Sequence, residues 1–149
     1  MKNVTQTFGV CTLSRPFDEQ RYIRIKIETE AVNLILSKVK QGGYILLVSP
    51  VHIKEFNAIP DIFERVELLT ILEKLGKPIK ANREKARERA EELVKTGFGV
   101  ADAAHVAFAE EAGAQFISCD DSLIKKCRNH NIKVWCGDPV AFCVKEGLR

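Results

Sequence analysis

The feature that most constrains the fold is a short, unbroken apolar run at residues 44–48, between the pair Gly42-Gly43 and the dipeptide Ser49-Pro50. A run of this length without polar positions is typical of a strand that is covered on both faces. Ser49 and Pro50 are residue types that cap a helix and begin it. A buried strand followed at once by a helix is the unit from which parallel α/β sheets are built.

The same alternation of strand and helix patterns continues along the chain. Residues 22–27 alternate like a strand, but a helical spacing of apolar residues continues for several more turns, so we expect one helix there. The predicted strands are 4–11, 44–48, 115–119 and 132–136, and the predicted helices are 18–40, 61–74, 83–95 and 100–112, with further helices that begin near Pro50, Asp120 and Pro139. This order predicts an α/β fold with three layers and a mostly parallel sheet of four or five strands.

Length and composition are those of a globular protein. The 149 residues are 46% hydrophobic and 29% charged, so we expect a single domain over 1–149 with a core and a hydrated surface. The longest apolar run is far shorter than the roughly 20 residues of a membrane-spanning helix. The first residues lack the pattern of a secretory signal, so we expect a cytoplasmic protein without a membrane partner. The net charge of +3 neither requires nor excludes a nucleic-acid partner.

The cysteines do not form a recognisable metal or redox motif. Their number, five, is odd, and no two of them are spaced as C-x-x-C, which argues against a zinc ribbon or a thioredoxin-type site. We expect small buried thiols in a reducing compartment.

Three acidic residues stand where a parallel sheet would gather its functional groups. Asp120 follows the predicted strand 115–119 directly, Glu55 lies about two turns into the helix after the strand 44–48, and Asp102 is in the first turn of the helix 100–112. Functional sites in such sheets form beyond the carboxyl ends of the strands, so the three carboxylates are expected to share one pocket. Each acid also has a simpler interpretation, which stays open: Asp120 as a helix cap, Asp102 as a first-turn acid and Glu55 as a solvated helix residue.

A cluster of carboxylates would favour a particular chemistry. Neighbouring carboxylates raise one another's pKa unless a cation neutralises them. Hard oxygen ligands in an open cluster suit Mg²⁺ or Mn²⁺, and such an ion can orient a phosphodiester and lower the pKa of an attacking water. Two neighbours could assist: His105 lies one helical turn after Asp102, and Ser118 precedes Asp120.

Three segments resemble the PIN-domain family of metal-dependent nucleases, which includes the VapC toxins. Asp102 opens a stretch that matches the family pattern D-A-x-H-x-A-x-A, and Ser118-Cys119-Asp120 matches the T-x-D that ends a family strand. Arg15-Pro16-Phe17-Asp18-Glu19-Gln20 is similar to the R-P-F-D-x-Q segment of one subgroup. Glu55, which follows a strand and Ser49, matches the position of the second family acid.

The resemblance implies both a fold and an activity. It implies a PIN-like fold and an endoribonuclease that hydrolyses RNA phosphodiesters with Mg²⁺ or Mn²⁺, with Glu55, Asp102 and Asp120 as the catalytic and metal-binding residues. It also implies RNA as substrate, a possible antitoxin-like protein partner, and a homodimer, for which the helices 18–40 and 61–74 offer apolar faces.

One position departs from the family pattern. The first family acid ends strand one, six residues before the Arg of R-P-F-D, and that position is Gly9 here. No acid occurs in residues 1–16, so Asp18 is the nearest candidate for a replacement. A site without one carboxylate predicts impaired ion binding, and the alternative function is a catalytically inactive PIN-like module that binds RNA or an antitoxin-like protein. A nucleotide-binding domain is disfavoured, because residues 11–16 contain no glycine for a phosphate loop.

Overall fold

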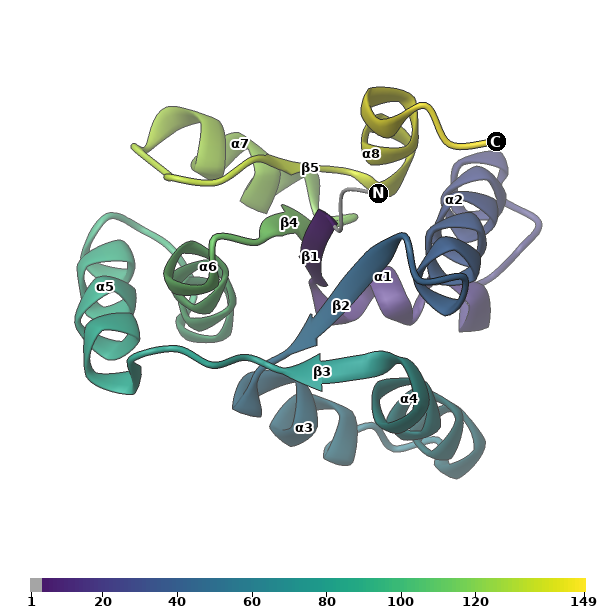
Figure 1. Ribbon diagram of the computed structural model, residues 1–149, viewed down its shortest axis with the longest axis horizontal. Helices are drawn as coiled ribbons and strands as arrows, with labels where there is room; N and C mark the ends of the chain where they lie inside the picture. Colours follow the sequence, from purple (N-terminus) through teal and green to yellow (C-terminus); the bar gives the residue numbers. More distant parts are fainter. Residues whose placement is uncertain (1–3) are drawn as a thin grey trace.

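The computed structural model describes residues 4–149 and contains a five-stranded sheet in the order β3-β2-β1-β4-β5 (Figure 1). All four neighbouring pairs are parallel. The strands are β1 (Val4–Phe8), β2 (Tyr44–Val48), β3 (Gly76–Pro78), β4 (Gln115–Ile117) and β5 (Cys136–Gly137). The predicted α/β class with a parallel sheet is therefore confirmed, with five strands.

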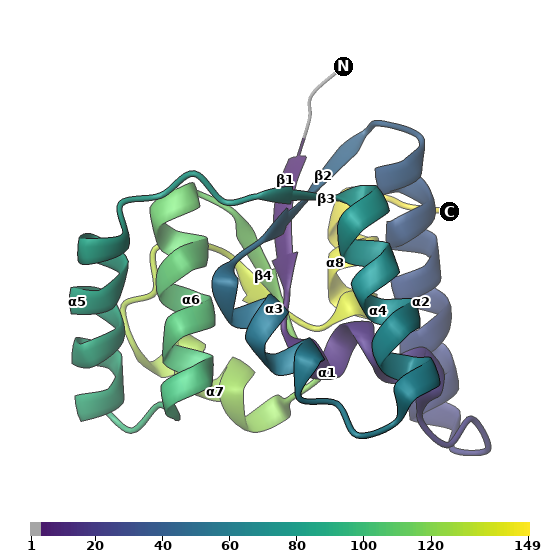
Figure 2. The ribbon, with the colours of Figure 1, turned by 90° about the horizontal axis from the view of Figure 1, so that it is seen from below.

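Helices cover both faces of the sheet. They are α1 (Val10–Leu13), η1 (Arg15–Phe17, a 3-10 helix), α2 (Ile23–Lys40), α3 (Pro50–Asn57), α4 (Ile62–Leu75), α5 (Arg83–Lys95), α6 (Val100–Ala112), α7 (Asp121–Asn129) and α8 (Pro139–Glu146). Figures 1 and 2 show α2, α4 and α8 on one side of the strands and α5 and α6 on the other. The arrangement has the predicted three layers.

Each face of the sheet carries its own apolar cluster. Phe8, Leu46 and Phe142 belong to the cluster under α2, α4 and α8. Phe98 and Phe116 belong to the cluster under α5, α6 and α7. Burial of these large side chains on both faces removes a large apolar area from water, which is the main favourable term in folding.

Local capping explains where several helices begin and end. The Asp61 side chain accepts a hydrogen bond from the backbone N–H of Glu64 and starts α4, as the sequence pattern predicts. Gly113 ends α6 in the left-handed conformation, with φ of 64°, which glycine adopts without steric penalty. The conflict at residues 22–27 is resolved as helix, because α2 runs without interruption from Ile23.

The structure differs from the sequence-based expectation at four strands, of which the smallest difference is that the predicted strand 115–119 ends at Ile117. The predicted strand 4–11 ends at Phe8, since Val10–Leu13 turns into α1, and the predicted strand 132–136 is reduced to Cys136–Gly137. The fourth difference is β3, Gly76–Pro78, which was not predicted. Glycine and proline are poor strand formers, and only pairing with the end of β2 makes this segment extended.

Two further expectations concern thiols and membranes. Cys119, Cys127 and Cys143 are buried and Cys136 is half-buried, whereas the Cys11 side chain lies outside the part of the chain that the structure describes. Among the helices of residues 4–149, none has the length and apolar character that spanning a bilayer requires.

The carboxyl edge of the sheet holds the starts of three helices. β1 runs downward from the N-terminus in Figure 2, and α1, α3 and α7 lie near its lower end. α1, α3 and α7 follow β1, β2 and β4 after only one to three residues. Side chains at these three junctions therefore meet at one edge of the sheet.

Candidate functional site

The three predicted acids lie around this carboxyl edge. Glu55 is on α3, Asp102 is in the first turn of α6, and Asp120 connects β4 to α7. Burial raises the pKa of Asp102 above its ordinary value, and the carboxylates of Asp120 and Glu55 raise it further, whereas His105 and Lys126 oppose them. The structure thus brings all three acids into one electrostatic environment, although they are far apart in the sequence.

Glu55 is bound within the protein. Nε2 of His105 donates a hydrogen bond to Oε1 of Glu55 at 2.5 Å, and this bond holds the pKa of Glu55 below its usual value. His105 itself is buried, with 3% of its side chain exposed. Its Nδ1 has no hydrogen-bond partner among residues 4–149. His105 is therefore packed in the core and also bonds a candidate site residue.

A second buried histidine connects α3 to β1, and the sequence analysis did not single it out. The backbone N–H of Ser49 donates to Nδ1 of His52 at 3.0 Å, so Nε2 carries the proton and donates to the Phe8 carbonyl at 2.6 Å. The His52 ring lies 4.6 Å from the His105 ring. Burial is the main cause that lowers the pKa of His52 to about 4, so it is neutral at neutral pH. Its position three residues after a Ser cap is the signal that could have identified it.

Asp120 serves as a helix cap and also belongs to the group of Glu55, Asp102 and Asp120, which we call the acidic pocket. Its Oδ1 accepts hydrogen bonds from the backbone N–H groups of Ser122 and Leu123 at 3.0 and 3.2 Å. Its own backbone N–H donates to Oγ of Ser118 at 3.1 Å. The Asp120 carboxylate also raises the pKa of Asp102, so Asp120 caps α7 and at the same time lies close to Asp102.

Gly9 lies at the end of β1, where its backbone N–H donates to the Ile117 carbonyl at 2.8 Å. A Cβ built at Gly9 would lie 3.5 Å from Oγ of Ser118 and 3.6 Å from the Phe116 ring, which are ordinary van der Waals distances. Its φ is not in the left-handed region. Neither the backbone conformation nor the space for a Cβ requires a glycine here, and that Cβ would lie beside Ser118.

Asp18 does not replace the missing acid. Nη1 of Arg15 donates to the Asp18 carboxylate at 3.0 Å, and Nε of Arg15 donates to the buried carboxylate of Glu28 at 3.0 Å. The Gln20 amide donates to the carbonyls of Arg15 and Asp18. The R-P-F-D-x-Q segment is therefore held to α2 by hydrogen bonds, and the Asp18 carboxylate is bound within that segment.

The donor set does not fit a divalent metal. Across residues 4–149, no three His, Cys, Asp or Glu side chains converge closely enough to hold a metal ion. Glu55 is engaged by His105, Asp120 caps α7, and the position opposite Ser118 is a glycine. Asp102 is the third acid, and its carboxylate makes no side-chain hydrogen bond within residues 4–149. One available carboxylate does not make an Mg²⁺ or Mn²⁺ centre.

Comparison with known proteins defines the fold. No family model and no curated protein sequence matches the chain. Among solved structures, FitAcB from Neisseria gonorrhoeae is similar with a TM-score of 0.55 and 15% identity, covering 90% of this chain and 97% of that one. PAE2754 from Pyrobaculum aerophilum is similar with a TM-score of 0.56 and 12% identity, covering 98% of each chain. These likenesses support a PIN-domain fold, as the sequence resemblance implied.

Proposed function

We propose that this chain is a PIN-fold binding module whose acidic pocket no longer supports metal-dependent hydrolysis of RNA. The pocket of Glu55, Asp102 and Asp120 corresponds to the nuclease site of the family, which would take Mg²⁺ or Mn²⁺. Position 9 is the observation that carries this proposal. A glycine stands where the resemblance places an acid, although the fold has room for a Cβ beside Ser118.

The remaining groups support the same conclusion. A cation site needs carboxylates that are free to turn toward one point, but the Glu55 carboxylate bonds His105 and Asp120 bonds two backbone N–H groups. These bonds replace the interactions that an ion would make. The pocket therefore retains the acids of a nuclease as structural groups of the fold.

Mn²⁺ binding and RNA cleavage test this proposal directly. We expect calorimetry of the native chain with MnCl₂ to give no binding heat, and single-stranded RNA with Mn²⁺ to stay intact. Gly9→Asp should bind Mn²⁺ and cleave the RNA, whereas Gly9→Asn, which has the same shape without the charge, should do neither. Cleavage by the native chain that Asp102→Asn abolishes would overturn the proposal. Failure of Gly9→Asp to bind Mn²⁺ would show that the bonds of Glu55 and Asp120, and not position 9 alone, exclude the ion.

Single-stranded RNA is the first candidate partner, and we expect it to bind the basic side chains of α7, because three carboxylates without a cation repel its phosphates. Lys126 on α7 already compensates the Asp102 charge, and Lys125 and Arg128 stand exposed on the same helix. We expect fluorescence anisotropy to detect single-stranded RNA binding in EDTA, with an affinity that falls as salt rises. The variant Lys125→Gln should weaken binding, whereas Lys40→Gln at the distant end of α2 should not. Equal binding by both variants would contradict this assignment.

An antitoxin-like protein is the second candidate partner. The likeness to FitAcB favours it, as do the exposed apolar side chains at the start of α2 and of α4. The same side chains could instead pair two copies of the chain. Light scattering on the native protein, Ile23→Glu and Phe63→Glu would separate these possibilities, because a homodimer through α4 should become a monomer only in Phe63→Glu.

A further inference from the structure

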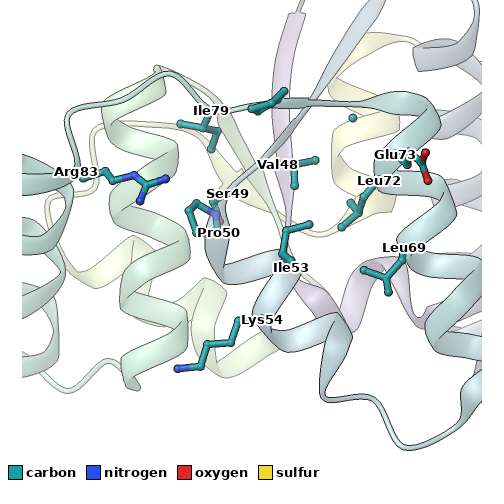
Figure 3. Close-up of a pocket in the computed structure, with 12 residues that line it drawn as sticks. Val48, Ser49, Pro50, Ile53, Lys54, Leu69, Leu72, Glu73, Ile79 and Arg83 are labelled. Carbon is teal, nitrogen blue, oxygen red and sulfur yellow. The ribbon is translucent and has the colours of Figure 1, made fainter.

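A concave region lies apart from Glu55, Asp102 and Asp120. It is an open groove of about 690 Å³ between α3, α4, β3 and the start of α5 (Figure 3). Its volume is within the range of sites that hold small molecules in proteins. Glu55, Asp102 and Asp120 are not among the residues that line it.

The walls of the groove are apolar. Figure 3 shows Val48, Ile53 and Leu72 between α3 and α4, with Leu69 farther along α4 and Ile79 beyond β3. Ile53 is 43% exposed, so the groove leaves apolar surface in contact with water. Covering this surface with an apolar ligand would be favourable in proportion to the area that it removes from water.

The charged residues at the rim of the groove are separated by the sign of their charge. Figure 3 shows Lys54 and Arg83 on the α5 side of the groove and Glu73 on the α4 side. Within residues 4–149, neither Lys54 nor Arg83 makes an ion pair or a side-chain hydrogen bond. Several arginines elsewhere are paired, such as Arg15 with Asp18, Arg24 with Asp121 and Arg89 with Glu110, whereas Arg65 and Arg128 make no ion pair within residues 4–149.

Arg83 is in an electrostatically unfavourable place. It is the first residue of α5, where the partial positive charge of the helix dipole disfavours a cation. An anion beside Arg83 would be attracted by both the guanidinium and the helix end. The groove therefore combines an apolar body with a rim that is positive on one side.

We propose that this groove binds a small amphipathic carboxylate, with its alkyl chain along Ile53 and Leu72 and its carboxylate beside Arg83 and Lys54. The proposal is independent of the function of the acidic pocket. A bound carboxylate would pair with Lys54 and Arg83, which have no ion-pair partner within residues 4–149. Glu73, on the opposite side, sets the direction of binding, because it repels a carboxylate at that end.

Straight-chain carboxylates of increasing length are the probes for this site. Calorimetry with octanoate, decanoate and dodecanoate, below the concentrations at which they form micelles, should show affinity that increases about fourfold for each added methylene. Methyl NMR of the native chain should locate the shifts at Ile53, Leu69 and Leu72. Decylamine, which has the same chain and the opposite charge, should bind more weakly than decanoate.

Two substitutions test separately how the apolar contacts and the charge interaction contribute to decanoate affinity. Ile53→Asp, at a partly exposed position, should reduce decanoate affinity at least tenfold while circular dichroism stays native. Arg83→Gln should weaken decanoate about threefold to fivefold and leave decanol binding unchanged. Arg87→Gln, one turn along α5 and outside the groove, is the matched control and should have no effect.

Three results would overturn the proposal. Decylamine could bind as tightly as decanoate, which would remove the role of the cations. The methyl shifts could appear away from the groove, as they would for an adventitious apolar site. Light scattering could show a dimer that Ile53→Asp dissociates while decanoate does not bind the native chain, in which case a second copy covers the groove.

Discussion

The acidic pocket and the apolar groove lie on opposite sides of the same helix and handle their charged groups differently. In the pocket, Glu55 is bonded to His105 and Asp120 to backbone N–H groups, so two of the three acids are satisfied by the protein itself. At the rim of the groove, Lys54 and Arg83 have no partner within residues 4–149. Charge that the fold has already paired is poorly available to a ligand, whereas unpaired charge beside apolar surface is available.

Helix α3 separates the two regions because its side chains point in different directions. His52 and Glu55 face α6, where both meet His105. Ile53 and Lys54 face the groove. Residues two apart on a helix project about 200° from each other, so Ile53 and Glu55 necessarily serve opposite sides. One short helix therefore supplies both the structural histidine network and a wall of the groove.

The largest expected effect concerns the pocket side and depends on pH. The pKa of His52 is about 4 in the folded chain and about 6.5 when unfolded, so the unfolded chain binds the proton first. Stability should be full above pH 6.5 and should fall by about 3 kcal/mol as the pH drops from 6.5 to 4, with no further loss from this group below that. Urea unfolding at a series of pH values measures it.

The matched variants test whether His52 is the cause. His52→Gln should be less stable at neutral pH and should lose this part of the pH dependence. His130→Gln, which changes a histidine outside the network, should keep it. If His52→Gln retained the full loss between pH 6.5 and 4, another group would be responsible.

Among substitutions in the groove, the largest loss of stability is expected at Gly76, which lines it. A Cβ at Gly76 would lie 2.6 Å from the Leu72 carbonyl oxygen and 2.4 Å from the Val48 side chain. We expect Gly76→Ala to lower the free energy of unfolding by about 2 kcal/mol, because the α4–β3 turn must shift. Gly43→Ala is the control, since its nearest contact would be 4.0 Å. Equal thermal stability of the two variants would show that the close approach at Gly76 is not needed.

A smaller effect should reveal the coupling within the pocket. Asp120→Asn removes one of the charges that raise the pKa of Asp102, so the pKa of Asp102 should fall. Carboxyl-detected NMR titration measures it. Asp121→Asn is the control, because the Asp121 carboxylate is bonded to Arg24 instead. An Asp102 pKa that did not move in Asp120→Asn would mean that the two carboxylates are not neighbours.

The smallest expected effect is a gain in stability at the groove rim. Arg83→Gln removes a cation from the positive end of α5, which should stabilise the chain by about 0.3–0.5 kcal/mol. Chemical denaturation at low salt should detect the gain, and high salt should reduce it. A loss of stability in Arg83→Gln would imply that Arg83 has a structural partner.

Much of the fold could be predicted from local patterns. The very polar stretch 83–95 and the alanine-rich stretch 100–112, each followed by glycine, were predicted as helices with the bounds that the structure has. Capping residues indicated where α3, α4 and α8 begin. Strand ends were harder, because the chain turns into α1 after Phe8 while its residues still favour a strand.

The site could be predicted only in outline. The spacing of Glu55, Asp102 and Asp120 after strands and in a first helical turn was visible, and so was the absence of an acid at position 9. The bond between His105 and Glu55 was not, because it joins residues 50 apart. The role of His52 on α3 was not visible for the same reason, since its acceptor is the carbonyl of Phe8 on β1.

The sequence by itself determined the alternation of elements, their caps and the lack of a first acid, since each of these depends on residues within a few positions of one another. Only the tertiary structure decided that Gly76–Pro78 becomes the edge strand, that the pocket acids are bonded within the protein, and that Lys54 and Arg83 border an apolar groove. The physical reason is that these features depend on contacts between distant segments, whose partners are set by packing and not by local conformational preference.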